Sequence, residues 1–555
     1  MPCEIAVKHN LATCESLLLA QTYLELWKPE SLPKPDEFIA DQIHGWASRA
    51  ALPSVVFATN LDELSDTQNQ AIRDDQLRSN LAVSVISLLA NLRPIHKATN
   101  ASDILLALAS FTSQQDPWTT QEAYAVATAL INGFISEAPA REFWICIEKI
   151  LKQRIRPVFA KTRNPAITPA GRKDFHPIPL ARFDASVLDS ETKPWKVTDV
   201  YATTALSWII NQYQPKAKEF LETQFPLLVP PILALIDDDN PTFKTRGCTV
   251  FSQILLTIQD SNSDILQRTN LSSVFEDAIR PCLLSLPTIT PEDEAIRLLT
   301  AAYPALLSLL KLNFLHPPRR STSQQTASPQ PTPKETYMGS LAKTLRDNLI
   351  PSFHHVSSTN TTSASAIPSY PYPRLSTLFL HHTCTIVQEL AIHSTKYLQD
   401  IVPLIHATLS NPFGPAYPSL LFSSVAVTRA VILNAHPRLW RWRGDILGAV
   451  CTCFVHVADE EQEIGRREQR GGLSSADEAT RGQMGQLKKQ LQGAVYLLKL
   501  ALENPVQGEG DAGQLEAKER LEKEIKELVE ADETLRDLLM ADVNGSEAVY
   551  FGVSN

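Results

Sequence analysis

The sequence predicts an all-α protein, organised as a solenoid of stacked antiparallel helix pairs. Apolar residues recur with helical periodicity along almost the whole 555-residue chain, and convincing strand alternation is nearly absent. Only 19 residues are glycine, whereas 38 are proline, and many of the prolines lie between apolar runs, where helices start and stop. One helix–turn–helix unit, at residues 226–259, has the features of a structural repeat.

In this unit an apolar run stops at an acidic turn. An asparagine suited to N-capping follows, with a proline at the first helical position, and then two basic residues and a glycine precede the next apolar run. This order is typical of a HEAT-type repeat, which buries its apolar face only by stacking on neighbours. We therefore expect a structural repeat turn made by Asp237, Asp238, Asn240, Pro241, Lys244, Arg246 and Gly247.

Periodicity also predicts the other helices. Residues 401–433 repeat the helix–Asn-Pro–helix order without the acidic residues. The full set of expected helices is 13–27, 36–50, 74–92, 101–111, 119–134, 138–152, 200–222, 226–236, 242–259, 264–285, 292–312, 336–350, 374–393, 398–409, 416–434, 437–457 and 484–503.

Composition divides these helices into regions, because Pro-rich, Ser/Thr-rich and charged stretches interrupt them. We expect an N-terminal helical region (1–156), a Pro-rich basic loop (157–198), central HEAT-like repeats (199–315), a disordered Ser/Thr/Pro-rich linker (316–335), C-terminal HEAT-like repeats (336–505) with mobile loops at 356–373 and 459–483, and an acidic tail with an amphipathic helix (506–555). That last helix would either cover the end of its own solenoid or pair with a partner.

The charge distribution argues against nucleic-acid binding. Residues 458–555 hold 12 Lys/Arg and 21 Asp/Glu, and the preceding residues are close to neutral, with 39 basic and 40 acidic. A nucleic-acid-binding protein needs a basic face that displaces counterions. No apolar run approaches the ~20 residues of a membrane span, and no secretory leader is evident. We expect a protein of the cytoplasm and nucleus that binds neither nucleic acid nor membrane.

No pattern of catalytic residues is present, so the sequence predicts no enzyme, cofactor or metal site. The phosphate-binding and hydrolase motifs are missing, and the eight cysteines are scattered, as buried thiols in a reducing compartment would be. Adjacent histidines such as His381 and His382 diverge on a helix and do not meet at one metal. The Asp237–Asp239 run could bind a metal, but a capped turn between two helices explains these residues without one and is the favoured interpretation.

The densest aromatic and basic patch lies at residues 437–447. On a helical wheel most of its apolar residues share one arc, with Arg443 near the centre of that arc and Arg438 and Arg441 on the other side. Arg443 would then be an internal tie between repeats, because a guanidinium at that position needs a carboxylate or carbonyl partner. Alternatively the patch binds a partner protein, since Trp and Arg dominate interface hot spots. Stacking on nucleic-acid bases is a third, weaker interpretation.

The runs at residues 230–255 and 437–447, with the helices at 275–312 and 337–351 between them, resemble the Tel-two-interacting protein two (Tti-two) family. The resemblance extends over about residues 200–505. It implies a HEAT-like, non-enzymatic scaffold subunit of the TTT complex, whose other subunits are of the Tti-one and Tel-two types.

The resemblance also implies a function. The complex works with the ninety-kilodalton heat-shock chaperone and its RuvB-like adaptor assembly to support folding and assembly of phosphatidylinositol 3-kinase-related kinases of the TOR, ATM and ATR types. Docking on Tti-one would involve the C-terminal helices, with candidate residues Arg438, Trp440, Arg441, Trp442 and Arg443. The alternative is an importin-like transport adaptor, which also stacks HEAT repeats and would bind a small nuclear GTPase.

Overall fold

A computed structural model describes residues 2–26, 37–58, 66–162, 164–168, 170–175, 193–315, 332–357, 370–471, 475–503 and 511–543. Within these ranges the regular secondary structure is helical, with one isolated antiparallel bridge between Ile167 and Lys173. The prediction of an all-α protein is therefore confirmed. The chain divides into two compact units, Met1–Cys282 with Pro304–Ser321, and Leu283–Tyr303 with Thr322–Asn555.

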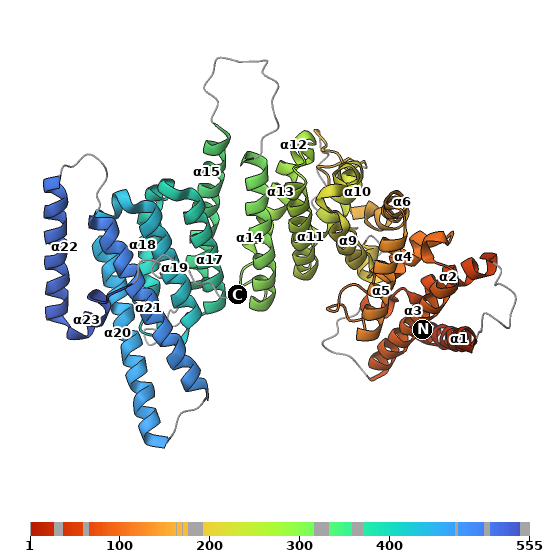
Figure 1. Cartoon of the computed structure of the whole chain (residues 1–555), viewed down its shortest axis with the longest axis horizontal. Helices are drawn as coiled ribbons and strands as arrows, with labels where there is room; N and C mark the ends of the chain where they lie inside the picture. Colours follow the sequence, from red (N-terminus) through yellow and green to blue (C-terminus); the bar gives the residue numbers. More distant parts are fainter. Residues whose placement is uncertain are drawn as a thin grey trace, which may run out of the picture. The chain divides into compact units, whose positions relative to one another are not determined.

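The first unit is built from helices that pack on both their next and their next-but-one neighbour (Figure 1). For example, α3 packs against α1, α2 and α5, and α4 packs against α2, α5 and α6. The helices of this unit are α1 (Pro2–Leu26), α2 (Glu37–Ala51), α3 (Asp66–Leu92), α4 (Ala101–Ala109), α5 (Gln121–Glu137), α6 (Ala140–Ile150), α7 (Arg156–Phe159), α8 (Pro194–Val197), α9 (Ala202–Gln212), α10 (Lys218–Ile236), α11 (Pro241–Asp260), α12 (Ile265–Arg268) and α13 (Ser272–Ile279).

The second unit repeats this packing order. The helix α19 packs between α17 and α21, while α18 packs on α20, and α20 forms a long hairpin with α21 (Figure 1). Its helices are α15 (Pro333–Thr344), α16 (Ile350–Ser357), α17 (Pro373–Leu390), α18 (Leu398–Leu409), α19 (Pro418–Ala435), α20 (Leu439–Gly471), α21 (Ser475–Glu503), α22 (Asp511–Ala531) and α23 (Arg536–Leu539). The helix α14 (Glu292–Leu315) has residues in both units.

Local sequence explains where many helices begin. Proline occupies the first turn of α11, α15, α17 and α19, where its missing N–H costs nothing. Thr120 caps α5 by accepting from the backbone N–H of Ala123. Thr332 and Glu335 form a reciprocal capping box at the start of α15.

Several expected boundaries are wrong. The expected helix 264–285 is divided into α12, α13 and a short 3₁₀ turn. The segment 459–483, expected to be a mobile loop, belongs largely to α20 and α21, because its charged residues form ion pairs along and between helices, such as Arg481–Glu468 at 3.1 Å. The expected helix 200–222 is broken at Tyr213–Ala217. The next helix, α10, runs unbroken through Pro226, Pro230 and Pro231, because burial of its apolar residues compensates for the lost backbone hydrogen bonds.

Among the described residues, three stretches are long and apolar enough, by length and composition alone, to cross a membrane: Pro215–Ile236, Glu292–Phe314 and Pro418–Gln469. This corrects the expectation that no run approaches that length. The first is apolar because α10 packs on α7, α11 and α13 and buries Leu228, Ile232 and Leu235 among them.

Several expected loops lie wholly or partly outside the described residues. Of the linker 316–335, the structure describes only 332–335, which open α15; of the loop 356–373, it describes residues 356–357 and 370–373. The Pro-rich loop 157–198 is described at both ends, where it forms short helical turns and the Ile167–Lys173 bridge. The expected amphipathic helix of the acidic tail is α22, followed by the short α23.

A buried histidine in the second unit makes its stability depend on pH. His382 is 5% exposed, and its ring lies 4.5 Å from that of Tyr303, whose hydroxyl donates to Asn348 Oδ1 at 2.6 Å. Burial, with a smaller effect of His381, lowers the pKa of His382 from 6.5 to about 3. Below pH 6.5 the imidazole of His382 is protonated in the unfolded chain, whereas in the folded chain it stays neutral until about pH 3.

We predict that the free energy of unfolding of this unit falls as the pH drops from 6.5 towards about 3, with His382 contributing up to about 1.4 kcal/mol per pH unit. His382→Phe should make this dependence shallower, as measured by urea unfolding at a series of pH values. His393→Phe, at an exposed position, is the control. An unchanged slope in His382→Phe would contradict the assignment.

Candidate functional site

The turn between α10 and α11 has the expected capped geometry. Asn240 Oδ1 accepts from the backbone N–H of Thr242 at 2.8 Å, and Pro241 takes the first helical position. The backbone N–H of Lys244 donates to the carbonyl of Asn240 at 3.1 Å and closes the first turn of α11. These contacts fix the direction in which α11 leaves the turn.

The acidic residues of the turn bind lysines from the end of the Pro-rich loop. The carboxylate of Asp238 is fully buried, 3.1 Å from Lys193 Nζ and 2.7 Å from Lys196 Nζ, and it accepts from the backbone N–H of Asn240 at 2.8 Å. Lys193 also lies 3.1 Å from Asp239. Burial acts to lower the pKa of Lys193, but the two carboxylates outweigh it and raise the pKa above its ordinary value.

Aromatic stacking holds these lysines in place. Trp195, fully buried between them in sequence, stacks on Phe159 with ring centroids 4.5 Å apart. At the other described end of the loop, Asn164 Nδ2 donates to Asp237 at 2.6 Å. Lysine ammonium groups therefore occupy the position that a cation bound to Asp238 would take. The described residues contain no group of three or more His, Cys, Asp or Glu side chains that could hold a metal.

Arg246 connects the turn to two other parts of the first unit. Its guanidinium donates to Thr203 Oγ1 and to Asp116 Oδ1, both at 2.7 Å. The second oxygen of Asp116 accepts from the hydroxyl of Thr204, so this side chain, only 8% exposed, is bonded at both oxygens. The contact joins α11, α9 and the loop before α5 across 130 residues of sequence.

Gly247 permits α10 and α11 to approach closely. A Cβ atom at this position would lie 2.7 Å from the backbone nitrogen of Ile236 and 2.9 Å from the carbonyl carbon of Leu235. Both are main-chain atoms of the preceding helix and cannot move aside. Glycine is therefore required here by backbone packing, and not by an unusual backbone dihedral.

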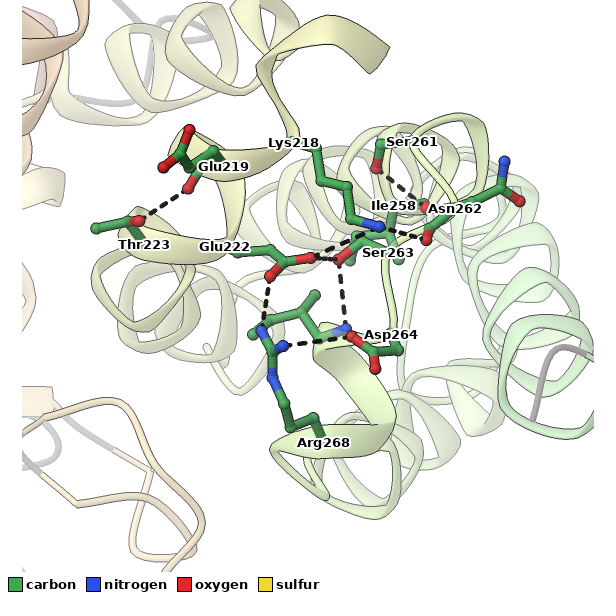
Figure 2. Close-up of polar contacts among 11 residues, drawn as sticks. Lys218, Glu219, Glu222, Thr223, Ile258, Ser261, Asn262, Ser263, Asp264 and Arg268 are labelled. Atoms are coloured by element: carbon green, nitrogen blue, oxygen red, sulfur yellow. Dashed lines mark hydrogen bonds and ion pairs between the residues drawn. The ribbon is translucent and has the colours of Figure 1, made fainter. Parts of the chain in front are cut away.

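A second polar cluster fixes the opposite ends of the same two helices (Figure 2). Glu222 of α10 accepts from Ser263 Oγ at 2.7 Å and from Arg268 of α12 at 2.8 Å. Lys218 Nζ donates to the carbonyl of Asn262 at 2.7 Å, just beyond the end of α11. Burial alone would raise the pKa of Glu222, but the hydrogen bonds from Arg268 and Ser263 outweigh it and lower that pKa. The pair α10–α11 is therefore held by polar contacts at both ends.

The structure separates the five residues proposed for partner binding. Arg443 forms a bidentate pair with Glu524 of α22, at 3.0 and 2.6 Å, and donates to the carbonyl of Trp440 at 2.8 Å. Its guanidinium also lies 4.5 Å from the ring of Trp440. Arg443 and Trp440 thus link α20 to α22 within the second unit, in line with the interpretation of Arg443 as an internal tie.

The other three face outward to different degrees. Arg438 and Arg441 are exposed, and Trp442 is half-buried with its ring 5.8 Å from the guanidinium of Arg441. Among the described residues, no carboxylate lies within ion-pair distance of Arg438 or Arg441. The second tryptophan, Trp440, is also half-buried. Arg438, Arg441 and Trp442 form what we call the 438–442 surface.

Sequence reasoning missed two features of these sites. Lys193 and Lys196 lie in a segment read only as a basic loop, and nothing in their spacing indicates the turn 45 residues later. Arg429 is 1% exposed in the middle of α19, where its guanidinium donates to Gln490 of α21, and burial lowers its pKa to about 10. A charged residue within the apolar run 420–433 was the sequence feature that could have indicated this buried arginine.

We predict that Gly247→Ala lowers the free energy of unfolding of the first unit by about 1–3 kcal/mol, because the added methyl group collides with the α10 backbone. Gly133→Ala in α5 is the matched control: nothing lies within 4 Å of its added Cβ, so it should be neutral or stabilise by up to about 1 kcal/mol. Chemical unfolding measures both. Equal effects of the two substitutions would contradict the close approach.

The model of the Tti2 family matches residues 104–416, which include the Asp116–Arg246 contact and the whole α10–α11 turn. The 438–442 surface and α20 to α23 lie beyond the matched residues. No curated protein and no solved structure matches the chain. Because the family model covers more than half of the sequence, and the helical fold agrees with it, the chain belongs to the Tti2 family.

Proposed function

We propose that this protein is a non-enzymatic scaffold subunit of the TTT cochaperone complex, bound to Tti-one-type and Tel-two-type subunits. The observation that carries the proposal is the family match over residues 104–416. The described residues support a binding role, since the polar clusters at Asp238, Arg246 and Glu222 all tie helices together and none is arranged around a reactive group.

The proposal includes a HEAT-like solenoid architecture. Packing of each helix on its next-but-one neighbour, as in α17–α19–α21 and α18–α20, supports it in the second unit, and α1–α3–α5 with α2–α4–α6 supports it in the first. Such stacking leaves long helical faces for protein binding. A scaffold of this kind could shield the apolar ridges of client kinases before they fold.

We assign docking on the Tti-one-type subunit to the 438–442 surface, comprising Arg438, Arg441 and Trp442. Two arginines and a partly exposed tryptophan are the residue types that carry binding energy at protein interfaces. Trp440 and Arg443 lie next to this surface, and Arg443 pairs with Glu524. We expect substitutions at these two residues to weaken binding only by destabilising the second unit.

Within the complex we propose the role that the family resemblance implies. The protein would act with the ninety-kilodalton heat-shock chaperone and the RuvB-like adaptor assembly on TOR-, ATM- and ATR-type kinases, in cytoplasm and nucleus, and so support TOR signalling and the DNA damage response. Neither nucleic acid nor a membrane is a proposed partner.

Affinity purification of the tagged full chain tests the complex. We expect Tti-one-type and Tel-two-type subunits in amounts close to stoichiometric, and no retention on a small nuclear GTPase in its GTP form. Recovery of neither subunit would refute the proposal, and retention on the GTPase would favour an importin-like adaptor.

Substitutions at two nearby arginines distinguish an effect on partner binding from an effect on stability. Arg441→Glu should weaken capture of the Tti-one-type subunit about tenfold or more without changing the melting temperature, because this side chain is exposed. Arg443→Ala should instead destabilise the second unit by about 1 kcal/mol, since it breaks the partly exposed pair with Glu524. Thermal melts and binding titrations on both variants measure this. Wild-type binding by a folded Arg441→Glu protein would exclude the 438–442 surface.

A further inference from the structure

The C-terminal helices of the second unit enclose a groove that the proposed scaffold function does not use. It lies among α21, α22 and α23 and has a volume of about 520 Å³, within the roughly 300–1,000 Å³ typical of ligand pockets. Leu521, Ile525 and Val529, one α-helical turn apart on α22, form its apolar floor, and Met540, 58% exposed, forms one side. We call this the α22 groove.

Specific contacts hold the walls of the α22 groove in place. Gln492 of α21 donates to the carbonyl of Asp537 at 2.8 Å, and Lys499 Nζ donates to the carbonyl of Leu539, so α21 binds both ends of α23. The Arg443–Glu524 pair fixes α22 to α20 on the other side. Because its three helices are tied in this way, the groove is a formed feature of the fold.

The chemistry of the groove suits a short uncharged apolar segment. Its rim carries Lys499, Lys526 and Arg536 together with three glutamates, so positive and negative charges balance. A charged ligand would gain little from such a rim, whereas an apolar one would bury its surface on the floor and desolvate few charges.

A segment of this kind follows the groove directly in sequence. Val549-Tyr550-Phe551-Gly552-Val553 is five residues long, uncharged at neutral pH and rich in apolar and aromatic side chains. It begins nine residues after Met540, and nine residues of extended chain span about 30 Å. The floor from Leu521 to Val529 is about 12 Å long, which four to five extended residues cover.

We propose that the α22 groove binds residues 549–553 of the same chain. The short connection gives the segment a high effective concentration at the groove, on the order of millimolar. Binding covers an apolar, β-prone sequence that would otherwise promote association between chains. The interaction does not depend on the proposed scaffold function, because every contact involved lies within one chain.

Site-specific photo-crosslinking in the full-length protein tests this. With p-benzoyl-phenylalanine replacing Tyr550, irradiation should link that position to Met540 or to residues 521–530 of the same chain, with a yield that does not depend on protein concentration. Peptide mass spectrometry identifies the linked residues. Links that join two chains and increase with concentration would overturn the proposal and identify a second copy as the occupant. Links elsewhere in the chain, or none, would also overturn it.

Variants of the groove complete the test. Met540→Glu should reduce the yield about fivefold or more relative to Met540→Leu, which controls for the loss of a reactive methionine. Neither change should alter the melting temperature, because Met540 is largely exposed. Val529→Lys is the second variant and should have the same effect on the crosslink. Yields equal to that of Met540→Leu in both charged variants, each shown to be folded, would contradict binding in the α22 groove.

Discussion

The ion pair between Arg246 and Asp116 is the contact on which the arrangement of the first unit depends. Stacked helices are held chiefly by apolar burial, which is strong but allows neighbouring helices to slide along one another. A guanidinium bound to a largely buried carboxylate and a buried threonine allows only one alignment. Apolar packing thus supplies most of the stability of this unit, and Arg246 fixes the register in which α11 packs against α9.

The α10–α11 pair shows how a small number of residues sets the geometry of two consecutive helices. Gly247 lets the two backbones approach closely, and Asp238 pairs with Lys193 and Lys196 at the end of the Pro-rich loop. Glu222 fixes the opposite ends of the two helices. The contacts of Asp238 and Glu222 join residues that are far apart in sequence, whereas Gly247 acts between two consecutive helices. In the second unit the Arg443–Glu524 pair has the same role, because it joins α20 to α22.

The sequence predicted the elements of this fold better than the contacts between them. Helical periodicity located most helices, and the Asn240 cap with Pro241 is present as expected. Local pattern failed at α10, where burial overrides three prolines, and at 459–471, where charge was read as mobility although it stabilises a helix. A helical wheel placed Arg443 on the inner arc, but the partner Glu524 is 81 residues away, and no local rule could name it.

The same limit applies to the polar clusters. The pairing of Asp238 with Lys193 and Lys196 depends on how a loop folds back, and the pairing of Arg246 with Asp116 depends on how α11 and α9 pack near the loop before α5. Of the five residues expected at a partner surface, Trp440 and Arg443 make contacts within the second unit, whereas Arg438 and Arg441 are exposed and Trp442 is half-buried.

A double-mutant cycle on Asp116 and Arg246 tests the central claim most directly. The free energy of unfolding would be measured for the wild type, Asp116→Ala, Arg246→Ala and the double variant. We expect a coupling energy of about 1–3 kcal/mol, because either single change leaves a partly buried charge without its partner. Additive effects of the two substitutions, with a coupling energy near zero, would show that the helices hold their alignment without this contact.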